Sequence, residues 1–184
     1  MRDKVMIQWL EIDGALFLKE IGLKKDDHIL DFGCRHGTYS IPAAKIIGDK
    51  GRVYAIDKEK SSLDELMKRS SGNNLFNITA IQGTEQVIHL LEKNNLDMIL
   101  LYDVYHLIQD RTTFLSNLHT LLKPSGILSI YPRHHKEKMN MNIKQIISEI
   151  ESIGFQFLTS HEKTMMHDDQ LVKDTVYNFK AYDK

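Results

Sequence analysis

An aspartate and a histidine stand three residues apart in the segment YDVYHLI, directly after an apolar run at 96–103. The pKa range of a histidine suits a general base, so His106 could deprotonate a thiol, a hydroxyl or a carbon acid. Asp103 lies at the end of the apolar run and is expected on the same side of the site. We therefore take Asp103 and His106 as candidate catalytic residues. The alternative is that His106 is a polar loop residue without a chemical role.

A glycine-rich turn, DFGCRHGTYS at 31–40, is the second stretch with chemical content. Gly33 ends an apolar segment and Gly37 opens a helical one, and glycine permits positive φ and close approach of a ligand to the backbone. Asp57 ends the next apolar segment about 20 residues further on, where an acid can accept hydrogen bonds from ribose hydroxyls. Together these features predict a site for a nucleoside-containing cofactor.

The glycine spacing argues against two other nucleotide sites. The turn does not read G-x-G-x-x-G, and no G-x-x-x-x-G-K-[ST] phosphate loop occurs in the chain. A nicotinamide oxidoreductase is disfavoured for the same reason, and because no Tyr-x-x-x-Lys helix is found.

Short apolar runs alternate with helical patterns along the chain, and these elements must position the candidate residues. The predicted strands cover 28–33, 52–57, 78–83, 96–103 and 127–132, and the last one follows a KPSG turn. The predicted helices cover 38–48, 59–72, 84–94, 110–122 and 142–154, with Val87, Leu90 and Leu91 on one face of the third. Asp110 is the expected N-cap of the fourth helix, and Gly154 is expected to end the fifth.

Five alternations of strand and helix predict a mostly parallel sheet with helices on both faces. Two further strand-like pieces, 155–160 and 171–182, predict an antiparallel C-terminal hairpin at one edge. The fold class is therefore α/β, a doubly wound, Rossmann-like sheet of seven strands. In such sheets a ligand binds beyond the carboxyl ends of the strands, where the glycine-rich turn falls.

Composition narrows the class of protein. The chain has 184 residues, enough for one domain over 1–184, in which 1–22 would form a helical cover. A net charge of −1 argues against a nucleic-acid-coating protein. No apolar run reaches transmembrane length, and the start lacks the pattern of a signal peptide. With a single cysteine, Cys34, a cytoplasmic and reducing location is expected.

Four motifs in order resemble the class I S-adenosylmethionine-dependent methyltransferases. ILDFGCRHG is similar to their first motif, D-x-G-x-G-x-G, and VYAIDKEKSSL to the second. LDMILLYDVYHLI is similar to the fourth, and LLKPSGILSIY to the fifth. The resemblance runs from about Leu23 to Pro132. Within the family the chain most resembles the small, cap-less menaquinone/ubiquinone-type and arsenite-type enzymes, although arsenite chemistry would need more than one cysteine.

The resemblance implies S-adenosylmethionine as cofactor, S-adenosylhomocysteine as product and a small-molecule methyl acceptor. It implies a role for each residue of the turn and of the strand ends. Asp31, Gly33 and Gly37 would shape the pocket for the methionine part, with Cys34 and Arg35 in the same turn. The ribose would be held by Asp57, the adenine would be flanked by Lys58, Gly83 and Thr84, and Tyr102 would lie near the methionine backbone.

Two positions depart from the family pattern. Arg35 stands where the middle glycine is usual, and Thr84 stands where an acid usually follows the third strand. We expect the Arg35 side chain to point to solvent, because its charge resists burial, so that only its backbone lines the pocket. The alternative is that the arginine occupies the pocket. The chain would then be a catalytically inactive relative with a binding or regulatory role.

The segment YPRHHKEK at 131–138 is rich in histidine and cations and is predicted to be a solvated loop. The neighbouring His134 and His135 should diverge, and no matching Cys or carboxylate spacing marks a zinc site, so we expect no metal. Cys34 is expected to fill space, because no His–acid pair identifies it as a nucleophile. The acceptor and the oligomeric state stay open.

Overall fold

The computed structural model describes residues 2–182, with side chains from Lys4 onward. Its centre is one seven-stranded sheet of order β3-β2-β1-β4-β5-β7-β6, in which only β7 runs antiparallel to its neighbours. The predicted fold class is therefore confirmed. The strands are β1 (His28–Phe32), β2 (Arg52–Asp57), β3 (Ile78–Gln82), β4 (Leu96–Tyr102), β5 (Leu122–Tyr131), β6 (Phe155–His167) and β7 (Gln170–Ala181).

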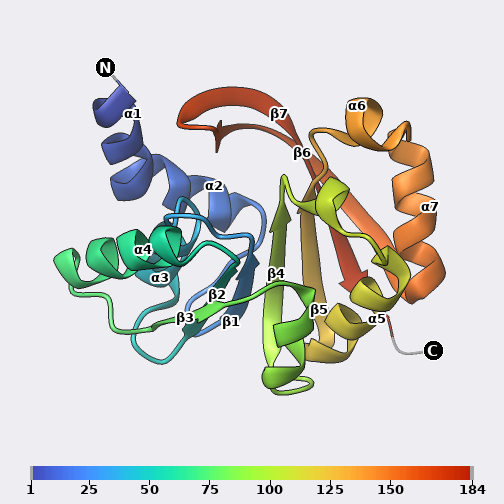
Figure 1. Cartoon of the computed structure of the whole chain (residues 1–184), viewed down its shortest axis with the longest axis horizontal. Helices are drawn as coiled ribbons and strands as arrows, with labels where there is room; N and C mark the ends of the chain where they lie inside the picture. Colours follow the sequence, from blue (N-terminus) through green and yellow to red (C-terminus); the bar gives the residue numbers. More distant parts are fainter. Residues whose placement is uncertain (1, 183–184) are drawn as a thin grey trace.

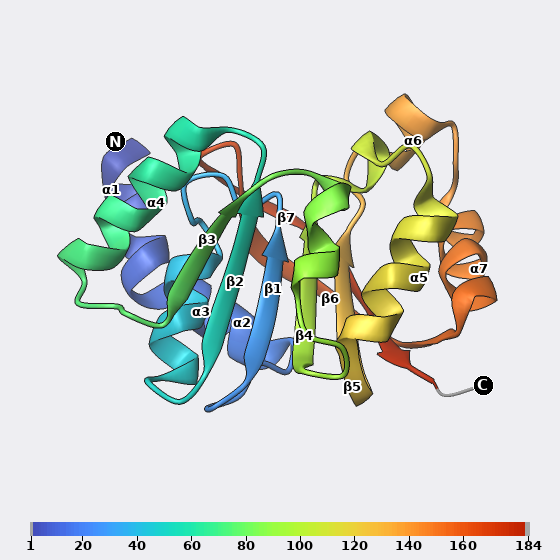
Figure 2. The ribbon, with the colours of Figure 1, turned by 60° about the horizontal axis from the view of Figure 1, so that its bottom comes forward.

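Helices cover both faces of this sheet (Figures 1 and 2). One face carries the N-terminal helices together with α3 and α4, and the other carries α5 and α7. The helical segments are α1 (Arg2–Gln8), the π-helical turn η1 (Trp9–Asp13), α2 (Gly14–Glu20), α3 (Ser40–Ile47), α4 (Lys60–Gly72), η2 (Glu85–Leu90), η3 (Tyr105–Leu107), α5 (Arg111–Leu121), α6 (His135–Met139) and α7 (Ile143–Ile153).

The central strands are buried on both faces because they read as continuous apolar runs. Ile29 packs into the core beneath α3, and the next residue, Leu30, packs into the core beneath α5. The same alternation along β4 sends Leu100 to the first core and Leu101 to the second, as the period of two along a strand requires. This rigid layer fixes where the strands end, and so where a site can form.

The predicted helix boundaries are set by their caps. The Asp110 side chain accepts a hydrogen bond from the Thr113 amide at the start of α5, as expected for an N-cap. Gly154 ends α7 with a φ of 124°, a value that side chains of other residues rarely permit. Along α7, Ile146 and Ile150 are fully buried against the core.

The N-terminal helices pack against the glycine-rich turn that follows the carboxyl end of β1. Trp9 is buried, and its indole N–H donates to the carbonyl oxygen of Thr38 over 2.8 Å. The buried amide of Asn178 on β7 donates to the carbonyl oxygen of Ile21 over 2.8 Å. These bonds tie the first helices to the turn on one side and to the C-terminal hairpin on the other.

The C-terminal hairpin is longer than the sequence indicated. The two strands pair from Phe155–Ala181 to His167–Gln170 with one register shift between Phe157 and Thr159, whereas β7 pairs with β5 only from residue 177 to 180. Its distal half therefore projects beyond the sheet and arches over the strand ends toward α1 and α2 (Figure 1). The expected limits of the second strand, 171–182, agree with β7, but the first strand, expected at 155–160, was predicted too short, because the exposed, alternating half of β6 does not read as strand.

Three other local predictions also need correction. The predicted helix at 84–94 is only the 3₁₀ turn η2, with Leu90 64% exposed and Ile88 buried instead. The segment 131–138, predicted to be a loop, contains the short helix α6. The KPSG segment, predicted to be a turn before the strand, lies inside β5. Beside it, the pairing of β5 with β4 shifts register between Leu96 and Met98.

Candidate functional site

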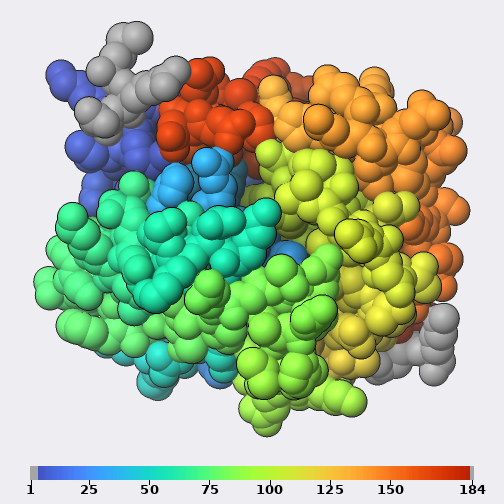
Figure 3. Space-filling view, viewed as in Figure 1, coloured from blue at the N-terminus to red at the C-terminus, as the bar shows by residue number. Residues whose placement is uncertain are grey.

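One large cavity, of about 1070 Å³, lies beyond the carboxyl ends of the parallel strands. From the side shown in Figure 3, the blue of the β1 region is visible only at the bottom of a narrow opening between green segments. Ten of the twelve residues predicted for the site line this cavity: Asp31, Gly33, Cys34, Arg35, Asp57, Lys58, Gly83, Thr84, Tyr102 and Asp103. They come from four strands that are far apart in sequence.

The two remaining predicted residues, Gly37 and His106, lie just outside the lining. Gly37 has a φ of 84°, and a Cβ built on it would lie 2.2 Å from the Leu66 side chain, so the turn packs directly on α4. His106 lies behind Asp103, with its Nδ1 3.9 Å from a carboxylate oxygen of that residue. Gly37 therefore supports the turn by packing on α4, and His106 lies next to the wall of the cavity.

The glycine-rich turn is held in place by Asp57. One carboxylate oxygen accepts the backbone N–H of Arg35 over 2.8 Å, and the other accepts the N–H of Glu59 over 2.9 Å. Gly33 and Cys34 both donate their N–H groups to the carbonyl oxygen of Ile56. The end of β2 thus fixes the backbone of the turn, and the Asp57 carboxylate remains at the cavity wall.

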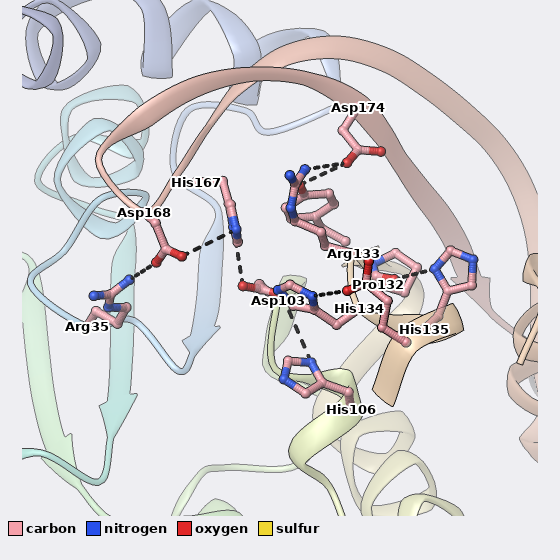
Figure 4. Close-up of polar contacts among 12 residues, drawn as sticks. Arg35, Asp103, His106, Pro132, Arg133, His134, His135, His167, Asp168 and Asp174 are labelled. Carbon is pink, nitrogen blue, oxygen red and sulfur yellow. Dashed lines mark hydrogen bonds and ion pairs between the residues drawn. The ribbon is translucent and has the colours of Figure 1, made fainter. Parts of the chain in front are cut away.

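Arg35 does not fill the cavity. Its backbone is left-handed, with a φ of 48°, and its side chain is 55% exposed. The guanidinium donates to the Asp168 carboxylate over 2.7 Å, at the tip of the β6–β7 hairpin (Figure 4). Both partners line the cavity, so their ion pair joins the turn to the hairpin at the rim of the cavity.

Asp31 lies at the bottom of the site and is almost fully buried, at 3% exposure. Burial raises the pKa of its carboxyl to about 6, and the nearby negative charge of Asp57 adds to this rise. The Ser40 hydroxyl donates a hydrogen bond to the carboxylate and opposes part of the shift. A cation bound beside Asp31 would favour the ionised form.

Cys34 and Tyr102 are structural parts of the cavity wall. Cys34 is buried, and burial raises the pKa of its thiol, which keeps the sulfur protonated and poorly nucleophilic. Tyr102 is also buried and shares a hydrogen bond of 2.8 Å with the Ser129 hydroxyl. These contacts agree with the expected space-filling role of Cys34.

A cluster of one aspartate and three histidines lies at the end of β4, where Asp103 and His167 line the cavity and His106 and His134 lie next to them outside the lining (Figure 4). The Asp103 carboxylate lies 3.2 Å from Nδ1 of His167, 3.5 Å from Nε2 of His134 and 3.9 Å from Nδ1 of His106. Burial raises the pKa of Asp103, and the three imidazoles oppose this shift. We call Asp103, His106, His134 and His167 the histidine cluster.

Sequence reasoning found half of this cluster. His167 was missed because it lies at the end of a strand that was expected to stop earlier, and only the arch of the hairpin brings it back to β4. His134 was noted but assigned to a solvated loop, because no matching Cys or carboxylate spacing marked a metal site. The parallel pairing of β4 and β5 brings their ends together, and the prediction of a doubly wound sheet with its ligand beyond the strand ends was the available signal.

The described part of the chain contains no helix that is long and apolar enough to cross a membrane.

Comparisons with known proteins give a consistent result. A family model described as a methyltransferase domain matches residues 23–176. A probable cobalt-precorrin-6B C(15)-methyltransferase of Saccharolobus solfataricus is 36% identical over 89 residues, which cover 47% of this chain and 44% of that protein. A demethylmenaquinone methyltransferase of Geobacillus stearothermophilus is 24% identical over 110 residues, which cover 60% and 47%. The chain thus spans less than half the length of these two relatives.

Among solved structures, one described as a SAM-dependent methyltransferase from Aquifex aeolicus superposes with a TM-score of 0.73. The match covers 98% of this chain and 97% of that one, at 23% sequence identity. At that identity the likeness concerns the fold.

Proposed function

This chain belongs to the methyltransferase domain family, and from that premise we propose that it transfers a methyl group from S-adenosylmethionine to a small-molecule acceptor. The observation that carries the proposal is the single cavity that joins Asp31 and Asp57 to Asp103. Its volume, about 1070 Å³, lies at the upper end of the range usual for ligand sites and leaves room for an acceptor beside the cofactor.

The residues present fit this cofactor. Gly33 has a φ of 78°, and a Cβ there would lie 2.3 Å from Val104, so the turn beside the cavity requires glycine at this position. Asp57 accepts one backbone N–H on each carboxylate oxygen, which leaves further acceptor capacity for ribose hydroxyls. Asp31 offers a buried carboxylate to the ammonium group of the methionine part.

The other predicted residues of the cavity wall would contact the remaining parts of the cofactor. Lys58, Gly83 and Thr84 would border the adenine, and Tyr102 would lie near the methionine backbone. When bound, the cofactor supplies an electrophilic methyl group on a sulfonium. The protein's own contribution is to orient the acceptor in line with that group and to exclude water. Because His106 lies outside the cavity lining, it would take a proton from the acceptor through Asp103.

The position of the β6–β7 hairpin supports separate places in the cavity for the cofactor and the acceptor. Its tip carries Met166, His167, Asp168 and Asp169, which line the cavity on the side that faces the glycine-rich turn. A bound cofactor would therefore lie between the turn and the hairpin, and the acceptor would enter beside the histidine cluster. The single domain over 1–184, a cytoplasmic location and the small-molecule nature of the acceptor are parts of this proposal.

Calorimetric titration with S-adenosylmethionine and S-adenosylhomocysteine tests the proposal. We expect one site per chain and at least tenfold weaker binding in Asp57→Asn, because the ribose would lose an ionised acceptor. Asp64→Asn is the matched control, since Asp64 is an exposed acid on α4 paired with Lys60. Absence of heat and of a thermal shift at millimolar ligand would instead support a relative without cofactor and without catalysis.

A further inference from the structure

We propose that Asp103, His134 and His167 form a binding site for a divalent transition-metal cation at the acceptor end of the cavity. One possible ligand atom from each residue lies within 4.8 Å of the other two. Cation binding at this site does not depend on methyl transfer, and it departs from the expectation of no metal drawn from the sequence. Its suggested role toward the acceptor, given below, rests on the proposed function.

The separations suit a shared cation better than direct hydrogen bonds. Oδ1 of Asp103 lies 3.5 Å from His134 Nε2, and its other carboxylate oxygen, Oδ2, lies 3.2 Å from His167 Nδ1. Atoms that bind one Zn²⁺ at about 2.0–2.2 Å in a tetrahedron lie roughly 3.3–3.6 Å apart. Oδ1 of Asp103 is buried and has no hydrogen-bond partner among the described residues, although two imidazoles face this carboxylate. A buried carboxylate oxygen without a partner is costly, and a cation at this point would satisfy it.

The other ring nitrogen of each histidine faces a carboxylate. His134 Nδ1 lies 3.1 Å from Glu137, and His167 Nε2 lies 3.4 Å from Asp168. A metal-binding histidine commonly donates its second ring N–H to a carboxylate, which fixes the tautomer and the ring orientation. Both imidazoles are thus oriented with one nitrogen toward Asp103 and the other toward an outer acid. Figure 4 shows His167 between Asp103 and Asp168.

The backbone conformation of Asp103 supports a ligand-binding role for the histidine cluster. Asp103 has a φ of 55°, an uncommon conformation for a residue other than glycine. Its N–H donates to the carbonyl oxygen of Tyr131, which holds this conformation at the end of β4. Strained backbone at the end of a strand beside a cavity is typical of ligand-binding positions.

The donor set indicates the class of cation. Two imidazoles and one carboxylate suit Fe²⁺, Co²⁺, Ni²⁺ and Zn²⁺, whereas Mg²⁺ and Ca²⁺ prefer oxygen ligands only. Three protein ligands leave coordination positions open, and Asp103 and His167 line the cavity. An acceptor oxygen or sulfur could take an open position, and the cation would lower its pKa. The acceptor would then be a molecule with a metal-binding hydroxyl or thiol group.

Titration of the tag-free, chelator-treated protein with Co²⁺ and Zn²⁺ tests the site. We expect one Co²⁺ per chain, visible d–d absorption bands and displacement by Zn²⁺ measured by calorimetry. His134→Ala, His167→Ala and Asp103→Asn should each weaken binding by more than about 100-fold, and Glu137→Gln by about 10-fold. Mg²⁺ should not displace Co²⁺.

Two matched histidine variants control for adventitious binding. His135→Ala removes the adjacent imidazole, which bonds to the carbonyl oxygen of Pro132, and His161→Ala removes an imidazole from the same strand as His167. Both should bind Co²⁺ as the unmodified protein does, and circular dichroism should show that all variants are folded. Equal binding in the cluster variants and the control variants would overturn the proposal, as would no binding at about millimolar metal.

These measurements contain no cofactor, so their outcome is separate from that of the proposed function. If Co²⁺ binds and S-adenosylhomocysteine does not, the metal site stands and the proposed methyl transfer fails. If S-adenosylhomocysteine binds and Co²⁺ does not, the metal site fails and the proposed function is unaffected.

Discussion

Arg35 and Asp168 are 133 positions apart in sequence, and their side chains form an ion pair of 2.7 Å across the rim of the cavity. Arg35 belongs to the glycine-rich turn, and Asp168 belongs to the tip of the β6–β7 hairpin. His167 connects this pair to Asp103, so the rim contact and the histidine cluster are one network (Figure 4). Arg35, which stands where the family pattern has its middle glycine, thus binds the tip of the hairpin across the rim of the cavity.

We predict that breaking this pair changes ligand release more than stability. Both side chains are more than half exposed, and exposed ion pairs contribute about 0–1 kcal/mol. Arg35→Gln and Asp168→Asn should each leave the free energy of unfolding within about 1 kcal/mol of the original. Each should raise the dissociation rate of S-adenosylhomocysteine severalfold in stopped-flow measurements. The double variant should show no further increase, and an additive increase would mean that the two residues act separately.

A second prediction separates the backbone of Arg35 from its side chain. The left-handed conformation, with a φ of 48°, costs a residue with a Cβ about 1–2 kcal/mol, and glycine avoids that cost. Arg35→Gly should therefore be about 1 kcal/mol more stable to urea than Arg35→Ala, since both lack the ion pair. Ligand affinity should not rise in Arg35→Gly, because the side chain does not fill the cavity. A much tighter complex would show that the arginine obstructs the site.

A third prediction concerns Gly37, which lies outside the cavity lining and supports the turn. In Gly37→Ala the new Cβ would lie 2.2 Å from Leu66, in addition to the strain of a φ of 84°. Gly48→Ala is also strained, because a φ of 69° with a ψ of −170° is nearly restricted to glycine, but its Cβ meets open space. In urea unfolding we expect a loss of about 1–3 kcal/mol at Gly48 from backbone strain alone, and a loss about 1–3 kcal/mol larger at Gly37 from the added clash. Equal losses would mean that Leu66 moves aside without cost.

The alternation of strands and helices could be predicted from the sequence because it depends on local signals. The runs around Ile29 and Leu100 are apolar on both faces, which marks central parallel strands. Asp57 was assigned to the site because a strand end and a glycine-rich turn are recognisable within about thirty residues. Such features need no knowledge of distant parts of the chain.

The extension of the hairpin beyond the sheet and the histidine cluster could not be predicted in the same way. Residues 158–164 of β6 alternate between exposed and half-buried positions, so they lack the apolar face that identifies a strand. His167 reaches Asp103 only because β6 and β7 support each other beyond the edge of the sheet. Contacts of this kind depend on where the chain returns in space, and a local pattern does not encode that.

A fourth prediction tests how the hairpin is held down. The buried hydroxyl of Tyr39 donates to the carbonyl oxygen of Met166 over 2.6 Å. Tyr39→Phe would leave that carbonyl without its partner, which costs about 1–3 kcal/mol. Hydrogen exchange should become faster at 160–175 and stay unchanged in β1 and β4. Tyr54→Phe is the control, because β2 does not neighbour the hairpin in the sheet, and an equal effect there would exclude a specific anchor.

The last prediction follows from the raised pKa of Asp31, about 6 in the folded protein against an ordinary value of 3.8. Between these two values the folded state holds a proton that the unfolded state has released. Stability therefore falls as the pH rises from about 4 to about 6, by up to about 3 kcal/mol, and is level above that range. Asp31→Asn should lack this decline. In urea unfolding at several pH values, the free energy of unfolding of Asp31→Asn relative to the original protein should therefore rise from about pH 4 to about pH 6.

Cofactor binding should depend on pH in the opposite direction. The ammonium group of the methionine part favours the ionised form of Asp31, so S-adenosylhomocysteine should bind more tightly as the pH rises from 5 to 7. Near pH 6 binding should release a proton, which calorimetry detects by comparing buffers of different ionisation enthalpy. Asp31→Asn should bind more weakly and lose the pH dependence. A pH-independent affinity in the unmodified protein, or one retained in Asp31→Asn, would show that Asp31 does not hold the ammonium group.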